Sequence, residues 1–251
     1  QTYTQQNIVI QNGWWNFVKP LDADNDGDID LVAGNLGLNT RLQASASEPV
    51  KMYFNDFDGN GKKEQVITFF VEGREVTLSS KSELELQMPV IKKDYIYAQD
   101  FAKAKINELL GQKNVQSGVV YQADYFANAI MLNDGTGKFT VTPMPWQAQL
   151  SSYRNALSFN ANNDSLPDLF LCGNYYANNI HKGRYDADFG TILVNKGAGR
   201  FEAEVVNGVF VKGEARKISG IQINKKPAAI IARNNDTAMV IGFSSPYITG
   251  K

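Results

Sequence analysis

Histidine and cysteine are almost absent from the sequence, which has one of each, His181 and Cys172. One histidine and one cysteine cannot supply the usual three or four ligands of a zinc site without recruited carboxylates. A single cysteine excludes a disulfide framework, and its place in the apolar run 169–172 is typical of a small buried hydrophobe. His181 follows the polar residues 178–179 and is expected at the surface. Zinc hydrolysis and histidine-assisted hydrolysis are therefore disfavoured.

Net charge and long apolar runs are also absent. Lysine and arginine number 25 against 26 aspartate and glutamate residues, so no overall field attracts nucleic acid or anionic lipid. No run of about 18 apolar residues occurs, which predicts that the chain has no membrane-spanning helix. The start of the chain, residues 1–6, is polar and begins with Gln rather than Met. We therefore expect a soluble fragment from which a signal segment or a larger region has been removed.

Two short patterns recur along the chain. The first is an acidic residue, a short apolar strand and Gly-Asn, at 30–35 and again at 168–174. The second, at 132–139 and 194–201, places glycines for a tight hairpin between two short strands. Further β-rich runs bounded by turn signals lie at 50–54, 65–71, 118–123, 129–132, 191–194, 228–232 and 238–243. This repetition predicts an all-β chain of blade-like units, a β-propeller that forms a single domain over 1–251.

One stretch departs from the strand pattern. Residues 80–83 form a capping-box sequence, and Pro89 ends the helical spacing that follows it. A second apolar stripe at helical spacing occupies 98–109 and closes at Gly111. Residues 79–111 are therefore expected to form a small α-helical insertion, which either covers an apolar edge or carries specificity.

The loop 22–30 reads Asp-Ala-Asp-Asn-Asp-Gly-Asp-Ile-Asp, with acids at loop positions 1, 3, 5 and 9 and glycine at position 6. Calcium takes about six to eight oxygen ligands, and alternate residues of a tightly turned loop direct their side chains inward. An EF-hand would need glutamate at position 12, where Ala33 stands. The predicted calcium ligands are the side chains of Asp22, Asp24, Asp26 and Asp30 and the backbone carbonyl of Asp28.

Two further loops keep this spacing. The loop 56–64 has asparagine at position 5, glycine at position 6 and glutamate at position 9, which predicts a second calcium site formed by Asp56, Asp58, Asn60, Lys62 and Glu64. The loop 160–168 has only two carboxylates and a serine in place of the glycine. Because charge count sets calcium affinity, its residues Asn160, Asn162, Asp164 and Asp168 predict a weak or empty site. The alternative for all three loops is a metal-free Asx-rich turn.

The Asp-x-Asp-x-Asp-Gly-x-x-Asp loop resembles that of FG-GAP and VCBS repeats, which integrin α-subunit heads share. Residues 13–16, 34–39 and 183–187 extend the resemblance, over residues 13–243, to bacterial FG-GAP/VCBS proteins that often carry a UnbV/ASPIC module. The resemblance implies a secreted or surface-attached, calcium-binding β-propeller. Loops near 22, 56, 160 and 224 indicate four to five blade-like units, so the propeller is incomplete or is completed by other sequence.

The resemblance favours a non-catalytic binding module outside the cytoplasm, which mediates adhesion or recognises an extracellular protein or glycan and is joined to other domains of a longer protein. A carbohydrate-active enzyme, either a polysaccharide lyase or a glycosidase with the carboxylates of Asp186 and Asp188, stays an alternative, as does a purely structural domain. Aromatic faces suit sugar rings, and the candidate ligand contacts are Arg184, Tyr185, Asp186, Tyr176 and Trp15.

Overall fold

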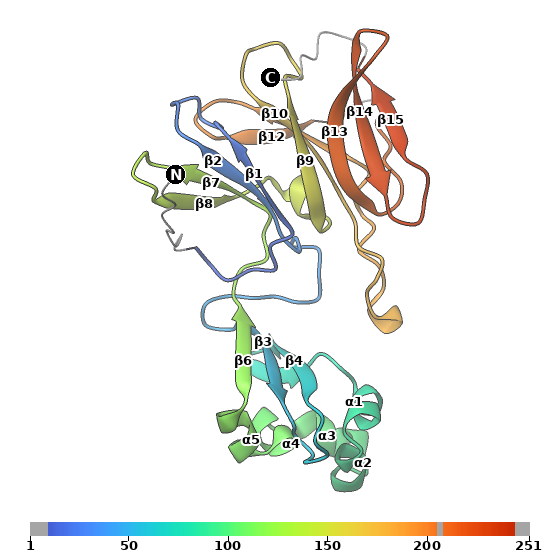
Figure 1. Cartoon of the computed structure of the whole chain (residues 1–251). Coiled ribbons are helices and arrows are strands. Elements are labelled where there is room, and N and C mark those ends of the chain that lie inside the picture. The colour runs from blue at the N-terminus through green and yellow to red at the C-terminus, as the bar shows by residue number, and fades with distance from the viewer. Residues whose placement is uncertain (1–9, 205–207, 244–251) are drawn as a thin grey trace. The chain divides into compact units, whose positions relative to one another are not determined.

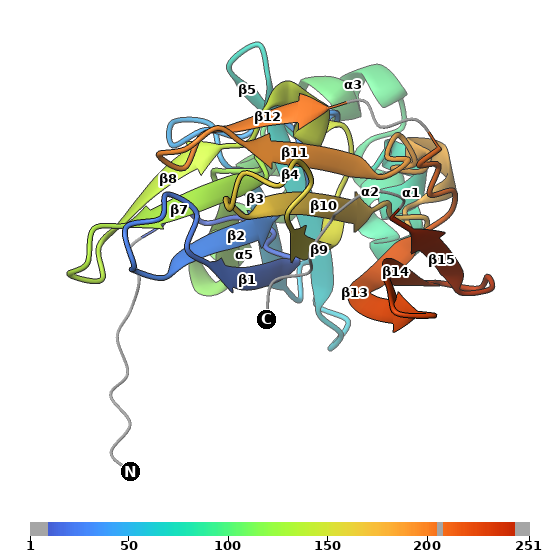
Figure 2. The ribbon, with the colours of Figure 1, turned by 90° about the horizontal axis from the view of Figure 1, so that it is seen from above.

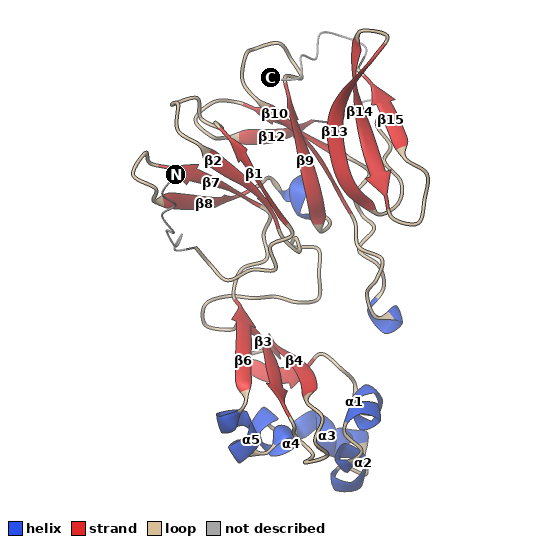
Figure 3. Cartoon of the chain, viewed as in Figure 1, coloured by secondary structure: helices blue, strands red, loops and turns tan. Residues whose placement is uncertain are grey.

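The chain folds into two compact units, and the computed structural model describes residues 10–204 and 208–243. Unit 1 comprises Gln1–Ile10, Trp14–Thr40 and Phe126–Lys251, and unit 2 comprises Gln11–Gly13 and Arg41–Tyr125. In sequence, unit 2 is therefore an insertion into unit 1. Figure 1 labels the elements of both units, and Figure 3 distinguishes their helices from their strands.

Unit 1 contains three antiparallel sheets in which sheet neighbours follow one another in the order of the chain. The first sheet has the order β1 (Phe17–Leu21), β2 (Asp30–Gly34), β7 (Ala129–Asn133) and β8 (Phe139–Pro143). The second is formed by β9 (Tyr153–Phe159), β10 (Asp168–Gly173), β11 (Thr191–Asn195) and β12 (Phe201–Glu204). The third is formed by β13 (Ala215–Ile223), β14 (Lys226–Arg233) and β15 (Met239–Gly242). The short 3-10 helices η1 (Trp146–Gln149) and η2 (Ile180–Lys182) lie in the connections.

The second sheet of unit 1 is buried on both faces. The side chains of β10 alternate between the two faces, because successive residues of a strand point to opposite sides. Leu169 and Leu171 belong to the core shared with the first sheet, whereas Phe170 and Cys172 belong to the core shared with the third. The first strands of the three sheets, β1, β9 and β13, lie side by side (Figure 2). The buried position expected of Cys172 is thereby confirmed, and burial raises the pKa of its thiol.

Unit 2 combines one antiparallel sheet with five short helices. The sheet has the order β5 (Arg74–Thr77), β4 (Glu64–Val71), β3 (Val50–Asn55) and β6 (Val119–Ala123). The helices are α1 (Lys81–Gln87), α2 (Val90–Asp94), α3 (Ala98–Lys103), α4 (Ile106–Leu110) and α5 (Gln112–Ser117). Tyr53 and Val66 from the sheet share one core with Leu84, Met88 and Ile91 from the helices.

The helices of unit 2 follow the local signals of the sequence. The amide of Ser80 donates to Glu83, and the amide of Glu83 donates back to the Ser80 hydroxyl, so the capping box is present at the start of α1. Pro89 separates α1 from α2. The stripe over 98–109 is divided at Ala104 into α3 and α4, and helix α5 continues beyond the expected end at Gly111.

The described residues are mostly β, in four antiparallel sheets, in agreement with the expected all-β class. No closed propeller occurs in these residues. None of the helices within residues 10–204 and 208–243 is long and apolar enough to cross a membrane.

Candidate metal centres

Each of the three Asx-rich loops joins two antiparallel strands that are neighbours in one sheet. The loop 22–30 connects β1 to β2, the loop 56–64 connects β3 to β4, and the loop 160–168 connects β9 to β10. All three bend through left-handed backbone conformations at loop positions 4 and 6. The corresponding φ angles are 65° and 96° at Asn25 and Gly27, 74° and 84° at Gly59 and Gly61, and 64° and 71° at Asn163 and Ser165.

The acid at position 9 anchors every loop in the same way. Oδ2 of Asp30 accepts a hydrogen bond of 2.7 Å from the amide of Ala23 at position 2, and Oε2 of Glu64 accepts one of 2.9 Å from Phe57. Asp168 accepts the corresponding bond from Ala161. All three acids are buried. Position 9 therefore fixes the loop whether or not a cation is bound.

In unit 1, the second oxygen of the position 9 acid is also used. Oδ1 of Asp30 accepts from the amide of Asn133 at 2.7 Å, and Oδ1 of Asp168 accepts from the amide of Asn195 at 2.8 Å. These asparagines end β7 and β11, at the expected hairpins that lead into β8 and β12. Each loop is thus fastened to the hairpin of its own sheet.

The first loop contains a cluster of carboxylate oxygens that could hold a metal ion. Asp22, Asp24 and Asp30 each offer one oxygen, and these oxygens lie within 4.8 Å of one another. Oδ1 of Asp22 and Oδ1 of Asp24 are buried without a hydrogen-bond partner. A buried acceptor without a partner costs free energy, and a cation bound between the two oxygens would satisfy both. The donor set is all oxygen, as calcium prefers.

The electrostatics of the first loop agree with this assignment. The pKa of Asp24 is raised, first by burial and then by the negative charges of Asp30, Asp26 and Asp22. Like charges close together disfavour ionisation, and a bound cation reverses that effect. Metal binding by this loop should therefore lower the pKa of Asp24.

The second loop has the same cluster with more internal hydrogen bonds. Asp56, Asp58 and Glu64 offer oxygens within 4.8 Å of one another. Oδ1 of Asp56 accepts from the amide of Gly59 at 2.8 Å, and its Oδ2 accepts from Gly61 at 2.8 Å. The loop is therefore already turned into a shape that gathers its three acids.

The third loop is held together by its own amides. Nδ2 of Asn162 donates to Oδ2 of Asp164 at 2.7 Å, at loop positions 3 and 5, where the first loop has the two carboxylates Asp24 and Asp26. Oδ1 of Asn160 accepts from the amide of Asn163 at 2.6 Å. Within the described residues, its acids form no group of three that could hold a metal ion. Ser165 adopts the left-handed conformation that glycine adopts in the other loops, at some cost in strain.

The remaining predicted ligands of the first two loops are exposed or half-buried. Asp26 is exposed, and its Oδ1 accepts from the amide of Asp28 at 2.8 Å. Asn60 is also exposed and accepts from the amide of Lys62 at 2.8 Å. Neither Asp26 nor Asp28 belongs to the acidic triad of its loop.

The predicted ligand contacts are gathered in part. The Arg184 guanidinium lies 4.8 Å from the centre of the Tyr176 ring. The pKa of Tyr176 is raised, first by burial and then by the negative charge of Asp186. Tyr185 is half-buried, with its hydroxyl 2.9 Å from that of Thr40. Trp15 is half-buried as well.

The two carboxylates of the glycosidase alternative occupy very different environments. Asp186 is exposed, whereas Asp188 is 2 % exposed. Oδ1 of Asp188 accepts from the hydroxyls of Tyr153 at 3.2 Å and Thr191 at 3.1 Å, and Oδ2 accepts from the amide of Gly173 at 3.2 Å. Burial raises the pKa of Asp188 to about 6. Its network connects the ends of β9, β10 and β11, a structural role that the sequence did not reveal.

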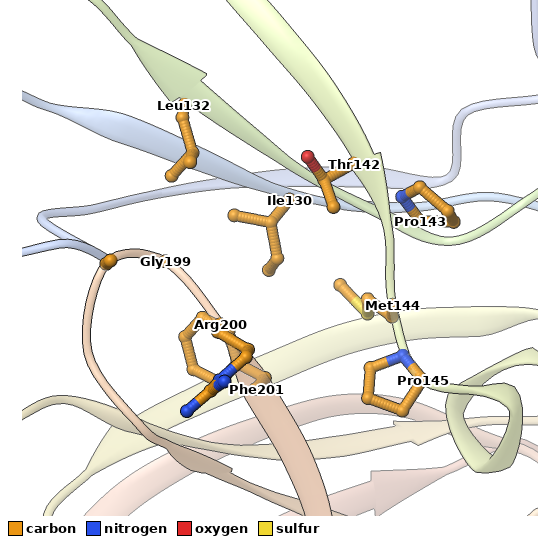
Figure 4. Close-up of a pocket in the computed structure, with 10 residues that line it drawn as sticks. Ile130, Leu132, Thr142, Pro143, Met144, Pro145, Gly199, Arg200 and Phe201 are labelled. Carbon is orange, nitrogen blue, oxygen red and sulfur yellow. The ribbon is translucent and has the colours of Figure 1, made fainter.

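A pocket of about 300 Å³ lies between the β7–β8 hairpin and the β11–β12 hairpin of unit 1 (Figure 4). Its lining is mainly apolar, with Ile130, Met144 and Phe201 among its residues. Among the described residues that line it, Arg200 is the titratable one.

No family model matches this chain, and no curated protein matches it.

Proposed function

We propose that this chain is a calcium-binding, non-catalytic segment of an FG-GAP/VCBS-type β-propeller that acts outside the cytoplasm. The observation that carries the proposal is the pair of buried, unpartnered carboxylate oxygens of Asp22 and Asp24 in the first loop. A hydrogen-bonded turn needs no such pair, whereas a hard cation does. The second triad, with Glu64 at position 9, supports a second ion.

The arrangement of unit 1 supports the propeller. Three meandering sheets stack face to face with their first strands side by side, and a strand-joining Asx loop follows the first strand of two of them. In the third sheet, β13 and β14 are joined by a tight turn at Asn224 and Lys225, without acids. In the proposed propeller, these three sheets are part of a ring that further blades of a longer protein complete.

Recognition of an extracellular protein or a glycan is the role proposed for this propeller. Calcium loops of an extracellular module are saturated at millimolar calcium, so the ions stabilise the fold and leave loops at the strand ends free to bind a partner. The tyrosines and arginines around Tyr176 are the surface proposed for adhesion or glycan recognition.

Thermal unfolding with and without calcium tests the proposal. A ligand that binds only the folded chain must raise the midpoint, so the midpoint in about 2 mM calcium should exceed that in excess EDTA by several degrees. Magnesium at the same concentration should have less effect, because it demands tighter octahedral geometry and gives up its water reluctantly. Equal midpoints in calcium and EDTA would refute the calcium assignment.

A further inference from the structure

Two β-bulges in unit 1 each insert an arginine as the extra residue. In the pairing of β9 with β10, Tyr153 faces Gly173 and Asn155 faces Cys172, so Arg154 lies between two successive pairs. In the pairing of β13 with β14, Ala215 and Lys217 face successive residues, so Arg216 is the extra residue. A bulge turns a side chain away from the regular alternation of its strand, and bulges concentrate beside functional sites.

The two bulges lie on neighbouring strands. The amide of Ile218 in β13 points at Oδ1 of Asn155 in β9, at 3.5 Å. Strands β9 and β13 are in contact and belong to adjacent sheets (Figure 2). This contact brings Arg154 of β9 and Arg216 of β13 to the same part of unit 1, and the pKa of Arg154 is lowered, first by burial and then by the positive charge of Arg216.

Both arginines are held in place by neutral or buried partners. Nη1 of Arg154 donates to Oδ1 of Asn16 at 2.7 Å, and its guanidinium lies 4.8 Å from the centre of the Tyr175 ring. Nη2 of Arg216 is 2.8 Å from Oε1 of Glu214, a carboxylate that is 2 % exposed. These contacts hold both guanidinium groups in place, but only Arg216 is paired with a carboxylate.

The donor capacity of this pair exceeds what the protein uses. Nε of Arg154 is buried without a hydrogen-bond partner. Glu214 is the acid paired with Arg216, and it also accepts from the amide of Tyr176 at 3.2 Å and from Nδ2 of Asn234 at 2.7 Å. Two guanidinium charges therefore share one carboxylate whose oxygens already have other donors. A second carboxylate would supply the missing acceptor.

We propose that Arg154 and Arg216 form a binding site for the carboxylate of an acidic sugar, a uronate. The guanidinium fork matches a carboxylate in two parallel hydrogen bonds, and the adjacent tyrosines, Tyr175 and Tyr176, offer ring surface for the sugar. An inorganic anion would contact the arginines alone, whereas the ring of a uronate can also lie against these tyrosines, which already stack on Arg154 and Arg184. This inference rests on the proposed recognition function and specifies its ligand class.

Calorimetric titration with trigalacturonate, in about 2 mM calcium, tests the site, and the fully methyl-esterified trisaccharide is the matched neutral probe. The acid should bind, and esterification or Arg154→Gln should each weaken binding at least about tenfold, because each removes a charge-assisted hydrogen bond. Arg154→Lys keeps the charge and should retain part of the affinity. Arg200→Gln, an exposed arginine on the β11–β12 hairpin, should bind like the unmodified chain.

Several outcomes would overturn the site. Equal affinity for the acid and its ester, or for the unmodified chain and Arg154→Gln, excludes a carboxylate held by Arg154. Binding of inorganic sulfate with no binding of trigalacturonate excludes the sugar. A calcium-dependent unfolding midpoint without uronate binding refutes this inference alone, whereas loss of both refutes the proposed function as well. If Arg154→Gln lowers the unfolding midpoint, the affinity of Arg154→Lys for trigalacturonate is the deciding measurement, and complete loss of its binding would overturn the site.

Discussion

Replacing Asp24 with asparagine should change stability in opposite directions with and without calcium. Oδ1 of Asp24 is buried without a partner, and the neighbouring acids Asp22 and Asp30 help to raise its pKa after burial. In excess EDTA, Asp24→Asn removes one charge from this cluster. Because the side chain is only half-buried and solvent screens its charge, we expect a gain of at most about 1 kcal/mol in the free energy of unfolding.

In calcium the same change removes a ligand. For a dissociation constant of about 0.1 mM, typical of extracellular modules, and about 5 mM calcium, binding adds roughly 2.3 kcal/mol. A ten- to hundredfold loss of affinity would leave about 0.2 to 1 kcal/mol of that stabilisation. The net effect of Asp24→Asn in calcium is then a lower midpoint, with about 2 to 4 °C for each kcal/mol lost in a chain of this size.

Differential scanning calorimetry at fixed protein concentration measures both directions. Asp164→Asn is the matched control, because this exposed aspartate occupies loop position 5 of the third loop, which has no acidic triad. The control should leave the calcium-induced rise of the midpoint unchanged. A lower midpoint for Asp24→Asn by the same amount in EDTA and in calcium would refute the reasoning, since the residue would then act only through the fold.

Three further predictions address the second loop, the buried acid and the helices. Glu64→Gln keeps an acceptor for the amide of Phe57 but removes a charge, so calorimetry should find one calcium ion fewer per chain with the fold retained. The pKa of Asp188 is about 6 in the folded chain, above its value in the unfolded chain. The protonated carboxyl therefore contributes up to about 3 kcal/mol to the free energy of unfolding, a contribution that is fully present below about pH 4 and is lost as the pH rises through 6. Asp188→Asn should therefore flatten urea-derived stability between about pH 4 and pH 6, and an unchanged slope would contradict the assignment. Leu84→Ala, at 0 % exposure, should cost about 2 to 5 kcal/mol in urea unfolding, whereas Leu86→Ala on the same helix, at 86 % exposure, should cost less than about 0.5 kcal/mol.

The local features of this chain were accessible from its sequence. The strand segments show alternating or continuous apolar residues between turn residues. The capping box at Ser80 and the helix end at Pro89 depend only on neighbours in the chain. The acids of the first two loops likewise gather because glycines allow left-handed turns at fixed spacing, as at Gly27 and Gly61. Short-range stereochemistry is sufficient for such predictions.

Features that depend on pairing between distant segments were not accessible. Strand β2 pairs with β7, so that Leu31 faces Met131, and no local pattern announces that unit 2 lies between them. The bulges at Arg154 and Arg216 depend on the register between two strands, which the residues adjacent to each arginine in the sequence do not indicate. The burial of Asp188 similarly results from three strand ends that meet in space.

Counting the calcium ions bound by the metal-stripped chain tests the central claim most directly. Isothermal titration of calcium into this protein should give two ions per chain, one for each acidic triad, and one ion each for Asp24→Asn and Glu64→Gln. A stoichiometry of zero would contradict the account and leave all three loops as hydrogen-bonded turns. A stoichiometry of two in both variants would contradict it as well, because neither Asp24 nor Glu64 would then be needed to hold an ion.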